Sequence, residues 1–307
     1  MKTMIDIFIP SYHRADNIKT AKYFVKIGWN PKNIHVVVDD EADDIEAYEF
    51  NCDKLGVNLH VINQEEARRT YDYVHRPSES RRSAGQSRNM FYEIAERLDI
   101  KFYCVQDDDT TGFQVKRKGK YKGMASFDDI TLFFEAIKEF MLRRRIGCFG
   151  ASQTGDFMSG TNRKLLRNKV MNTTFYNTPF IYKGERGVQD DDTSQFVGIM
   201  NEGLFTGSTG DGIVLIQTSS ATAKGGLTEL YNECKLLNKS LVCPIQFPSA
   251  IYVDSQKTNG GRIHHKIISK YLYPRLIKTI GANNIRWDTY PEDTPFTNEN
   301  LMTKDVV

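Results

Sequence analysis

The chain has 307 residues, of which 40% are hydrophobic and 26% are charged, and its formal net charge at pH 7 is +2. This composition indicates one large, soluble, enzyme-sized unit with enough apolar residues to build a core. The small net charge excludes general electrostatic attraction of the whole chain to nucleic acid, so each basic cluster must be judged separately.

The five cysteines are scattered, and they lack the spacing of a metal site. Several lie in apolar, strand-like stretches, so we expect reduced thiols in the core and a cytoplasmic protein. The only apolar stretch among the first ten residues contains an acid, and nowhere does the sequence approach the ~20 apolar residues of a transmembrane helix. We therefore expect no targeting segment and no membrane partner.

The first half of the chain alternates predicted strands with predicted helices. Helical spacing of apolar residues follows Asp16, which we expect to cap the N-terminus of a helix that ends near Val25. Strands are predicted at 5–9, 33–38, 58–62 and 101–106, and further helices at 44–55 and 84–98. This alternation predicts an α/β fold, a mixed and mostly parallel Rossmann-like sheet with helices on both faces.

The second half of the chain is less regular. We predict a helix at 127–145, a strand at 146–152, one or two strands within 168–182, a helix that the segment 187–194 opens and that runs to 202, a strand at 213–217 and a helix at 227–238. No internal repeat or low-complexity linker is visible. The sequence therefore predicts one catalytic domain over residues 1–285 and a polar C-terminal tail over 286–307.

The most informative motif is the triplet Asp107-Asp108-Asp109, which directly follows the predicted strand 101–106. Alternate residues at a strand end point the same way, so Asp107 and Asp109 can present oxygen ligands together. Mg²⁺ and Mn²⁺ prefer carboxylate oxygens and keep positions open for phosphate. A solvated acidic turn, or an acidic helix N-cap, is the alternative.

Polar residues also follow two other predicted strands. Pro10-Ser11 ends the first strand, and Asp39-Asp40 ends the second. Ligands of parallel α/β sheets bind outside the carboxyl ends of the strands, so these segments and the acidic triplet are expected at one cleft.

The order and spacing of these segments resemble those of the GT-A-fold nucleotide-sugar glycosyltransferases. The stretch from Ile7 to Arg14 is similar to that family's first strand and loop, with His13 in place of a common Asn. The stretch from Gly85 to Asn89 is similar to its Gly-x-x-x-Ala-Arg-Asn segment, with Ser87 in place of Ala. The resemblance implies a set of donor-binding residues: Pro10, Ser11, Tyr12, Arg14, Asp39, Asp40, Arg88 and Asp108.

The same resemblance implies the metal and the catalytic base. Asp107 and Asp109 match the family's metal-binding Asp-x-Asp motif for Mn²⁺ or Mg²⁺, and His264 or His265 lies where a C-terminal metal ligand is expected. The segment 189–192 resembles the later acidic pair that carries the base of inverting members. This implies Asp190 or, preferably, Asp191 as the base, whereas Asp192 fits a helix N-cap.

More narrowly, the chain resembles the TET/JBP-associated glycosyltransferases, which are encoded largely by bacteriophages and modify hydroxymethylated pyrimidines in DNA. This implies an enzyme of the host cytoplasm that moves a hexose or pentose from a UDP-sugar to 5-hydroxymethylcytosine. Lys116, Arg117 and Lys118 lie on a predicted loop beside the metal motif, where they are expected to contact DNA phosphates. Solvated lysines on a hairpin are the alternative.

Three other functions remain open from the sequence. The chain could glycosylate a saccharide or a protein, it could act as a sugar nucleotidyltransferase with the same carboxylates, or it could bind DNA without catalysis. Neither the transferred sugar nor the stereochemical course can be read from the sequence.

Overall fold

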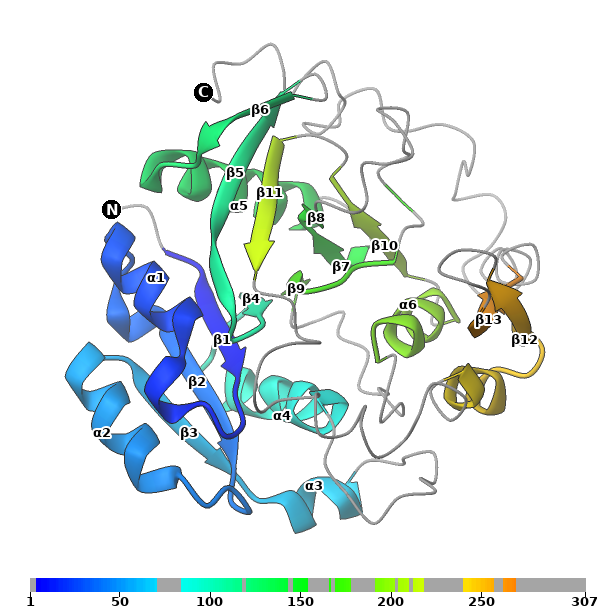
Figure 1. The fold of residues 1–307 in the computed structure, drawn as a ribbon, viewed down its shortest axis with the longest axis horizontal. Helices are drawn as coiled ribbons and strands as arrows, with labels where there is room; N and C mark the ends of the chain where they lie inside the picture. Colours follow the sequence, from blue (N-terminus) through cyan, green and yellow to red (C-terminus); the bar gives the residue numbers. More distant parts are fainter. Residues whose placement is uncertain are drawn as a thin grey trace.

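The structure is a computed structural model, and it describes residues 4–70, 84–117, 120–142, 146–153, 166, 169–177, 191–201, 204–209, 212–217, 240–256 and 262–268. A seven-stranded sheet in the order β10-β7-β9-β4-β1-β2-β3 runs through its centre (Figure 1). Its strands are β1 (Asp6–Pro10), β2 (Ile34–Asp39), β3 (Asn58–Ile62), β4 (Phe102–Gln106), β7 (Ile146–Gly150), β9 (Thr173–Asn177) and β10 (Phe205–Ser208).

Only β9 runs against the other strands of this sheet. It pairs antiparallel with both β4 and β7, whereas the remaining pairs are parallel. The carboxyl ends of β1, β2 and β4 therefore lie at the same end of the sheet, where Ser11 follows β1, Asp39 is the last residue of β2 and Asp107 follows β4. The sheet order places β1 between the other two strands, so the three predicted polar segments are neighbours.

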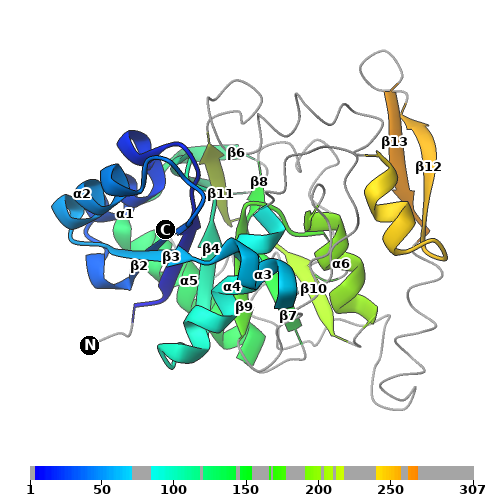
Figure 2. The same ribbon diagram turned by 90° about the horizontal axis from the view of Figure 1, so that it is seen from below.

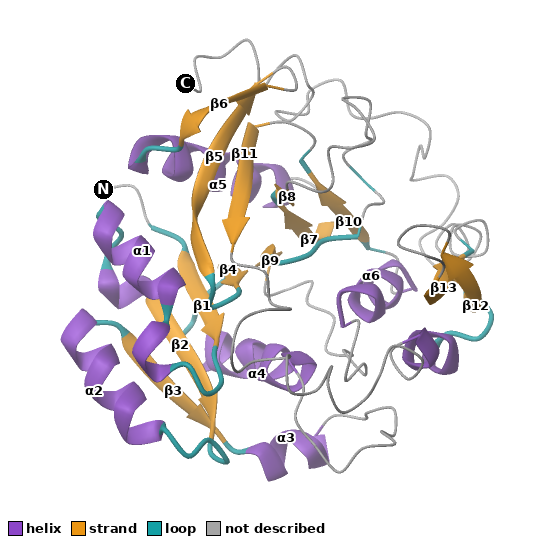
Figure 3. Ribbon diagram, in the orientation of Figure 1, coloured by secondary structure: helices purple, strands orange, loops and turns teal. Residues whose placement is uncertain are grey.

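Helices cover both faces of the sheet because successive strand residues point in opposite directions. Ile7 and Ile9 of β1 join a core with one group of helices, whereas Phe8 joins a second core on the other face. The first face is covered by α1 (Lys19–Ile27), α2 (Ile45–Leu55) and α5 (Phe127–Leu142), and the second by α4 (Ala84–Arg97) and α6 (Asp191–Asn201) (Figure 3).

A second sheet, in the order β6-β5-β11-β8, packs on the first face. Phe113 and Val115 of β5 and Ile213 of β11 contribute to the same core as α1 and α5. Its strands are β5 (Thr110–Arg117), β6 (Lys120–Met124), β8 (Ser152–Gln153) and β11 (Gly212–Gln217). Because β5 starts directly after the acidic triplet, this sheet fixes the triplet from its C-terminal side.

A separate hairpin, β12 (Ile251–Gln256) and β13 (Arg262–Ile267), packs against α6 (Figure 2). Phe196, Val197 and Met200 of α6 contact the residues beside this hairpin, whereas Ile199 faces the central sheet. Both sides of α6 are therefore buried, which fixes the position of its first residue, Asp191.

The predicted fold class, a mixed and mostly parallel α/β sheet with helices on both faces, is confirmed. The first helix begins at Lys19 rather than after Asp16, which lies in a short 3-10 turn and does not cap α1. Within the segment 116–122, predicted as a loop with a hairpin as the alternative, residues 116–117 end β5 and residues 120–122 begin β6, so the described residues form a hairpin pair. The predicted helix at 227–238 and the tail at 286–307 lie outside the described residues.

Residues 240–246, ahead of β12, are also helical, and two shorter elements lie earlier in the chain. The 3-10 turn Pro31–Asn33 precedes β2, and the helix α3 (Gln64–Thr70) follows β3. Among the described residues, no helix has the length and apolar character needed to cross a membrane.

Candidate functional site

Asp108, the middle residue of the acidic triplet, is tied to the loop after β1. Its Oδ1 pairs with the guanidinium of Arg14, and its Oδ2 accepts a hydrogen bond from Ser11 Oγ at 2.8 Å. Ser11 Oγ also lies 2.8 Å from the hydroxyl of Tyr48, which accepts the backbone N–H of Arg14 at 3.0 Å. Because the Ser11 hydroxyl donates its proton to Asp108, the Tyr48 hydroxyl must donate to Ser11 Oγ. These contacts fix the loop after β1 to the acidic triplet.

Thr20, in the first turn of α1, holds the backbone of the triplet. Its hydroxyl donates to the carbonyl of Asp107 and accepts the N–H of Thr110 at 2.9 Å, and its own N–H donates to the carbonyl of Asp108 at 3.2 Å. Thr20 is fully buried. This clamp makes the end of β4 a rigid platform for the carboxylates.

Arg88 joins the two acidic segments that the sequence placed about eighty residues apart. Its Nη2 lies 3.2 Å from Asp107 Oδ1, and its Nη1 pairs with Asp191 Oδ2. The side chains of Arg88 and Asp191 are only 15% and 11% exposed. α4 and α6 cover the same face of the sheet, so the guanidinium reaches from one helix to the start of the other.

Asp109 has an oxygen that nothing in the described structure satisfies. The residue is 6% exposed, and its buried Oδ1 has no hydrogen-bond partner among the described residues. Burial, and then the carboxylates of Asp107 and Asp108, raise the pKa of Asp109 to about 7. A buried carboxylate oxygen beside two further carboxylates fits a divalent cation, which would relieve both the burial and the repulsion.

The two predicted histidine ligands lie on β13, near the second acidic segment. His265 is buried, and its Nε2 is 3.3 Å from the hydroxyl of Thr193 on α6. Within the described part of the chain, one set of three possible ligands has all its ligand atoms within 4.8 Å, and it contains neither histidine. A role for His264 or His265 beside Asp107 and Asp109 stays a prediction.

That compact set consists of His13, Asp43 and Asp44, on the loops after β1 and β2. His13 Nε2 lies 2.9 Å from Asp43 Oδ1, and the ring of His13 stacks on Tyr12 with 3.8 Å between ring centroids. The side chain of Asp43 is 85% exposed. Tyr12 is thus held beside the predicted donor loop by its histidine neighbour.

Asp192, predicted as a possible helix N-cap, is instead the second residue of α6, and it forms an ion pair. Its Oδ1 accepts the N–H of Thr193 at 2.8 Å, and its Oδ2 lies 2.6 Å from Lys169 Nζ. Burial opposes ionisation of Asp192, but Lys169 and the Thr193 N–H together hold its pKa below the usual value. Asp190 lies outside the described residues, so of the two predicted bases only Asp191 can be placed.

Of the two carboxylates at the end of β2, that of Asp39 is buried and that of Asp40 is exposed. Asp39 is 6% exposed, and burial above all raises its pKa to about 6, although its Oδ1 accepts the Glu41 N–H at 3.1 Å. Asp40 is exposed and accepts hydrogen bonds from the Asn63 side chain at 2.9 Å and the Gln64 N–H at 3.0 Å. Asp40 therefore braces the ends of β2 and β3.

The basic residues predicted to contact DNA do not border the acidic triplet. Lys116 and Arg117 are the last residues of β5, and Lys118 lies outside the described residues. A strand rises about 3.3 Å per residue, so the seven residues after Asp109 carry Lys116 roughly 20 Å away from the triplet. Figure 1 shows β5 running away from the ends of β1 and β4 toward its turn with β6.

Sequence reasoning found the carboxylates but missed the groups that hold them. No sequence motif marks Thr20, Tyr48 or Lys169, because each contacts a partner that is distant in the sequence. Arg88 was predicted as a donor-binding residue, whereas in this structure its guanidinium contacts the carboxylates of Asp107 and Asp191.

The sequence matches the model of one protein family, described as TET-Associated Glycosyltransferase, over residues 5–226. The chain belongs to the TET-associated glycosyltransferase family. The match covers both acidic segments, Arg88 and the loop after β1, and it confirms the predicted enzyme class and the GT-A-like fold class. Comparison with curated proteins found none with a matching sequence.

Solved structures of several glycosyltransferases are similar to this TET-associated glycosyltransferase. The mannosyltransferase PcManGT from Pyrobaculum calidifontis, in complex with GDP-Man and Mn²⁺, is 12% identical with a TM-score of 0.49, and the match covers 80% of this chain and 63% of that chain. Glucosyl-3-phosphoglycerate synthase from Mycobacterium tuberculosis, in complex with Mg²⁺ and UDP, is 9% identical with a TM-score of 0.43, and coverage is 87% and 88%.

Proposed function

We propose that this glycosyltransferase moves a hexose or pentose from a UDP-sugar to the hydroxyl of 5-hydroxymethylcytosine in DNA, with Mn²⁺ or Mg²⁺ as cofactor. The observation that carries the proposal is the bridge made by Arg88, which brings Asp191 and the acidic triplet into one buried network. This network supports a site in which the donor and the acceptor of a sugar transfer meet at the carboxyl ends of the strands.

The donor side is formed by the loop after β1 and the end of β2. The contacts of Ser11 and Arg14 with Asp108 fix this loop, so its remaining polar groups are pre-organised for a nucleotide. Asp39 suits the uracil or ribose, because a nucleotide N–H or O–H would compensate its buried charge. Asp40 is already committed to the turn after β3, so it supports the position of Asp39.

Asp107 and Asp109 would hold the cation. A divalent ion there would neutralise charge that develops on the UDP leaving group. The unsatisfied Oδ1 of Asp109 supports this assignment, since buried carboxylate oxygens are otherwise hydrogen-bonded. In the structure Arg88 contacts both Asp107 and Asp191. With a cation bound to Asp107, Arg88 would either move between the two carboxylates or remain with Asp191.

Asp191 is the proposed general base for an inverting displacement. It would take the proton of the hydroxymethyl group as the hydroxyl oxygen bonds to the anomeric carbon and the bond from that carbon to the diphosphate breaks. Arg88 holds the Asp191 carboxylate in one orientation. An arginine contact of this kind positions the base before the acceptor arrives.

The acceptor assignment rests on the family and on the β5–β6 hairpin. Lys116 and Arg117, at the end of β5, lie roughly 20 Å along the strand from the triplet, which corresponds to about six base pairs of duplex. A duplex with its target base at the triplet would therefore bring its backbone to the hairpin. Basic residues there would contact phosphates without reading sequence.

A nucleoside mass-spectrometry assay tests the proposal. Duplex DNA containing 5-hydroxymethylcytosine, and the same duplex with cytosine, are incubated with the enzyme, Mn²⁺ and UDP-glucose or UDP-arabinose. We expect a glycosylated nucleoside from the first duplex and none from the second. Sugar found on a free saccharide or on protein, with the hydroxymethylated duplex unchanged, would overturn the acceptor. Formation of UTP and the sugar 1-phosphate after pyrophosphate is added to the UDP-sugar would point to a nucleotidyltransferase.

A charge-neutralising variant separates DNA contact from catalysis. Replacing Lys116, Arg117 and Lys118 with Gln should weaken duplex binding and lower the salt dependence by about one counterion per lost contact, while hydrolysis of the UDP-sugar without acceptor is unchanged. Lys26→Gln on the exposed side of α1 is the matched control.

A further inference from the structure

The acidic triplet and Asp191 carry more negative charge than the arginines beside them neutralise. Arg14 pairs with Asp108, and Arg88 contacts both Asp107 and Asp191. In their ionised forms the four carboxylates therefore carry two negative charges beyond the two positive charges of these guanidinium groups. This excess equals the charge of one divalent cation.

One guanidinium, that of Arg88, serves two of these carboxylates. Its Nη2 lies 3.2 Å from Asp107 Oδ1, and its Nη1 pairs with Asp191 Oδ2. Asp107 follows β4, whereas Asp191 begins α6, so the two contacts reach different elements of the fold. Because each contact uses a different nitrogen, Arg88 can lose Asp107 and keep Asp191.

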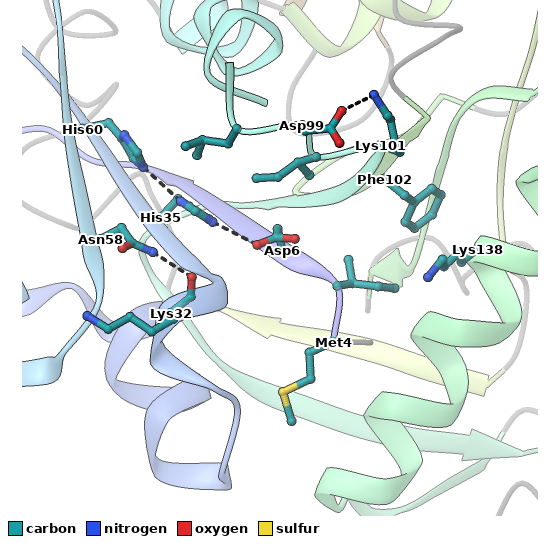
Figure 4. A pocket seen from close by; sticks show the side chains of 13 residues that line it. Met4, Asp6, Lys32, His35, Asn58, His60, Asp99, Lys101, Phe102 and Lys138 are labelled. Carbon is teal, nitrogen blue, oxygen red and sulfur yellow. Dashed lines mark hydrogen bonds and ion pairs between the residues drawn. The ribbon is translucent and has the colours of Figure 1, made fainter. Parts of the chain in front are cut away.

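The carboxylates at the amino ends of the same strands are paired differently (Figure 4). Asp99, ahead of β4, forms an ion pair with Lys101, and Asp6, in β1, lies 3.0 Å from His35 Nε2. Each of these two carboxylates has a partner of its own, whereas Asp107 and Asp191 share one guanidinium. Lys101 also offers a position, at the other end of β4, where one positive charge can be removed without touching the acidic triplet.

Arg88 places a positive charge on a carboxylate that would also bind the divalent cation. Burial raises the pKa of Asp107, and Arg88 is the largest of the influences that oppose this rise. Arg88 is therefore the main counter-charge of Asp107. A charge within ~4–6 Å changes an ionisation equilibrium by about tenfold or more. The guanidinium should accordingly weaken the binding of a second positive charge to Asp107 by about tenfold or more.

We propose that Arg88 competes with the divalent cation for Asp107, so that the acidic triplet binds the cation tightly only together with the diphosphate of the donor. The diphosphate supplies negative charge that offsets the guanidinium. Arg88 then leaves Asp107 and keeps its contact with Asp191, which makes it a positioning residue that couples donor binding to the orientation of the base. The inference rests on the proposed function, because that function assigns the cation to the triplet.

Mn²⁺ binding to the full chain, followed through the electron paramagnetic resonance of free Mn²⁺, tests this competition. Without UDP, Arg88→Met should bind Mn²⁺ about tenfold more tightly than the wild type. Lys101→Met, which also removes one positive charge, should bind Mn²⁺ as the wild type does. Arg88→Lys keeps the charge and should stay within about threefold of the wild type. UDP should raise the Mn²⁺ affinity of the wild type by about tenfold or more.

Two further measurements cover the case in which Arg88→Met folds poorly. Asp191→Asn leaves the guanidinium to Asp107 alone, so the Mn²⁺ affinity of this variant without UDP should fall about fivefold. A ligand stabilises the folded state more when its Kd is lower. The same Mn²⁺ concentration should therefore raise the urea midpoint of Arg88→Met more than that of the wild type or of Lys101→Met.

The outcomes separate this inference from the proposed function. Mn²⁺ binding by Arg88→Met that is equal to or weaker than that of the wild type, or an unchanged affinity in Asp191→Asn, would overturn the competition, while the proposed sugar transfer would stand. Failure of the wild type to bind Mn²⁺ even with UDP would refute the proposed cofactor, and the inference with it.

Discussion

Replacing Arg88 with Met tests whether the guanidinium is the counter-charge of both acidic segments. Methionine keeps most of the apolar volume of the arginine stem, so the change removes mainly the charge and the donors. Asp107 and Asp191 then lose the guanidinium with which both are paired, and Asp191 is 11% exposed. Breaking a buried pair by removing one partner costs about 3–5 kcal/mol. We expect the free energy of unfolding to fall by that amount.

Urea unfolding followed by tryptophan fluorescence measures this loss, since Trp29 is buried in the core. Arg69→Met is a matched control, because Arg69 pairs with Glu65 one helical turn away and both side chains are more than two-thirds exposed. It should cost at most about 0.5 kcal/mol. Adding Asp191→Asn to Arg88→Met should restore about 1–3 kcal/mol. A loss no larger than that of Arg69→Met, or no restoration by the second change, would refute the bridging role.

Two further predictions concern pH. Raising the pKa of Asp39 from 3.8 to about 6 corresponds to about 3 kcal/mol against the ionised form in the folded state. Asp39→Asn should therefore stabilise the ligand-free protein by up to that amount at pH 7.5, with the gain vanishing below pH 4; a gain that does not depend on pH would contradict this. The pKa of Asp192 is lowered, so its pairing with Lys169 contributes stability above the unfolded pKa that is lost as the pH falls. Lys169→Met should cost about 1–2 kcal/mol at pH 7 and less at pH 3 in urea titrations; an equal cost at both pH values would show that the charge is not involved.

The sequence predicted the parts of the fold that depend on local pattern. Apolar stretches marked the strands of the parallel sheet, and the alternation with helices implied that their carboxyl ends share one edge. Asp39 and Asp107 were therefore expected near each other, and the sheet order β4-β1-β2 places them so. The β5–β6 hairpin was predicted only as the alternative to a loop, because its lysines and glycines hid a period-two pattern, in which Phe113 and Val115 face the core.

The contacts that organise the site depend on distant residues, and a single sequence does not contain them. Arg88 meets Asp191 only because α4 and α6 cover the same face of the sheet. Tyr48 reaches Ser11 across 37 residues, and Thr20 reaches the backbone of Asp107 across 87. A motif identifies the carboxylates, but the order of the strands and the packing of the helices decide which cation or hydroxyl each one meets.

We propose above that the two acidic segments form one metal-dependent transfer site. The decisive measurement is sugar transfer to hydroxymethylated duplex. It is made on the wild type with Mn²⁺, on the wild type with EDTA, and on the Asp191→Asn protein with Mn²⁺. We expect no transfer in EDTA and a loss of about 10²–10⁴ in rate for Asp191→Asn, with Mn²⁺-dependent binding of UDP retained by that variant. Full transfer in EDTA, or a wild-type rate from the Asp191→Asn protein, would contradict the claim.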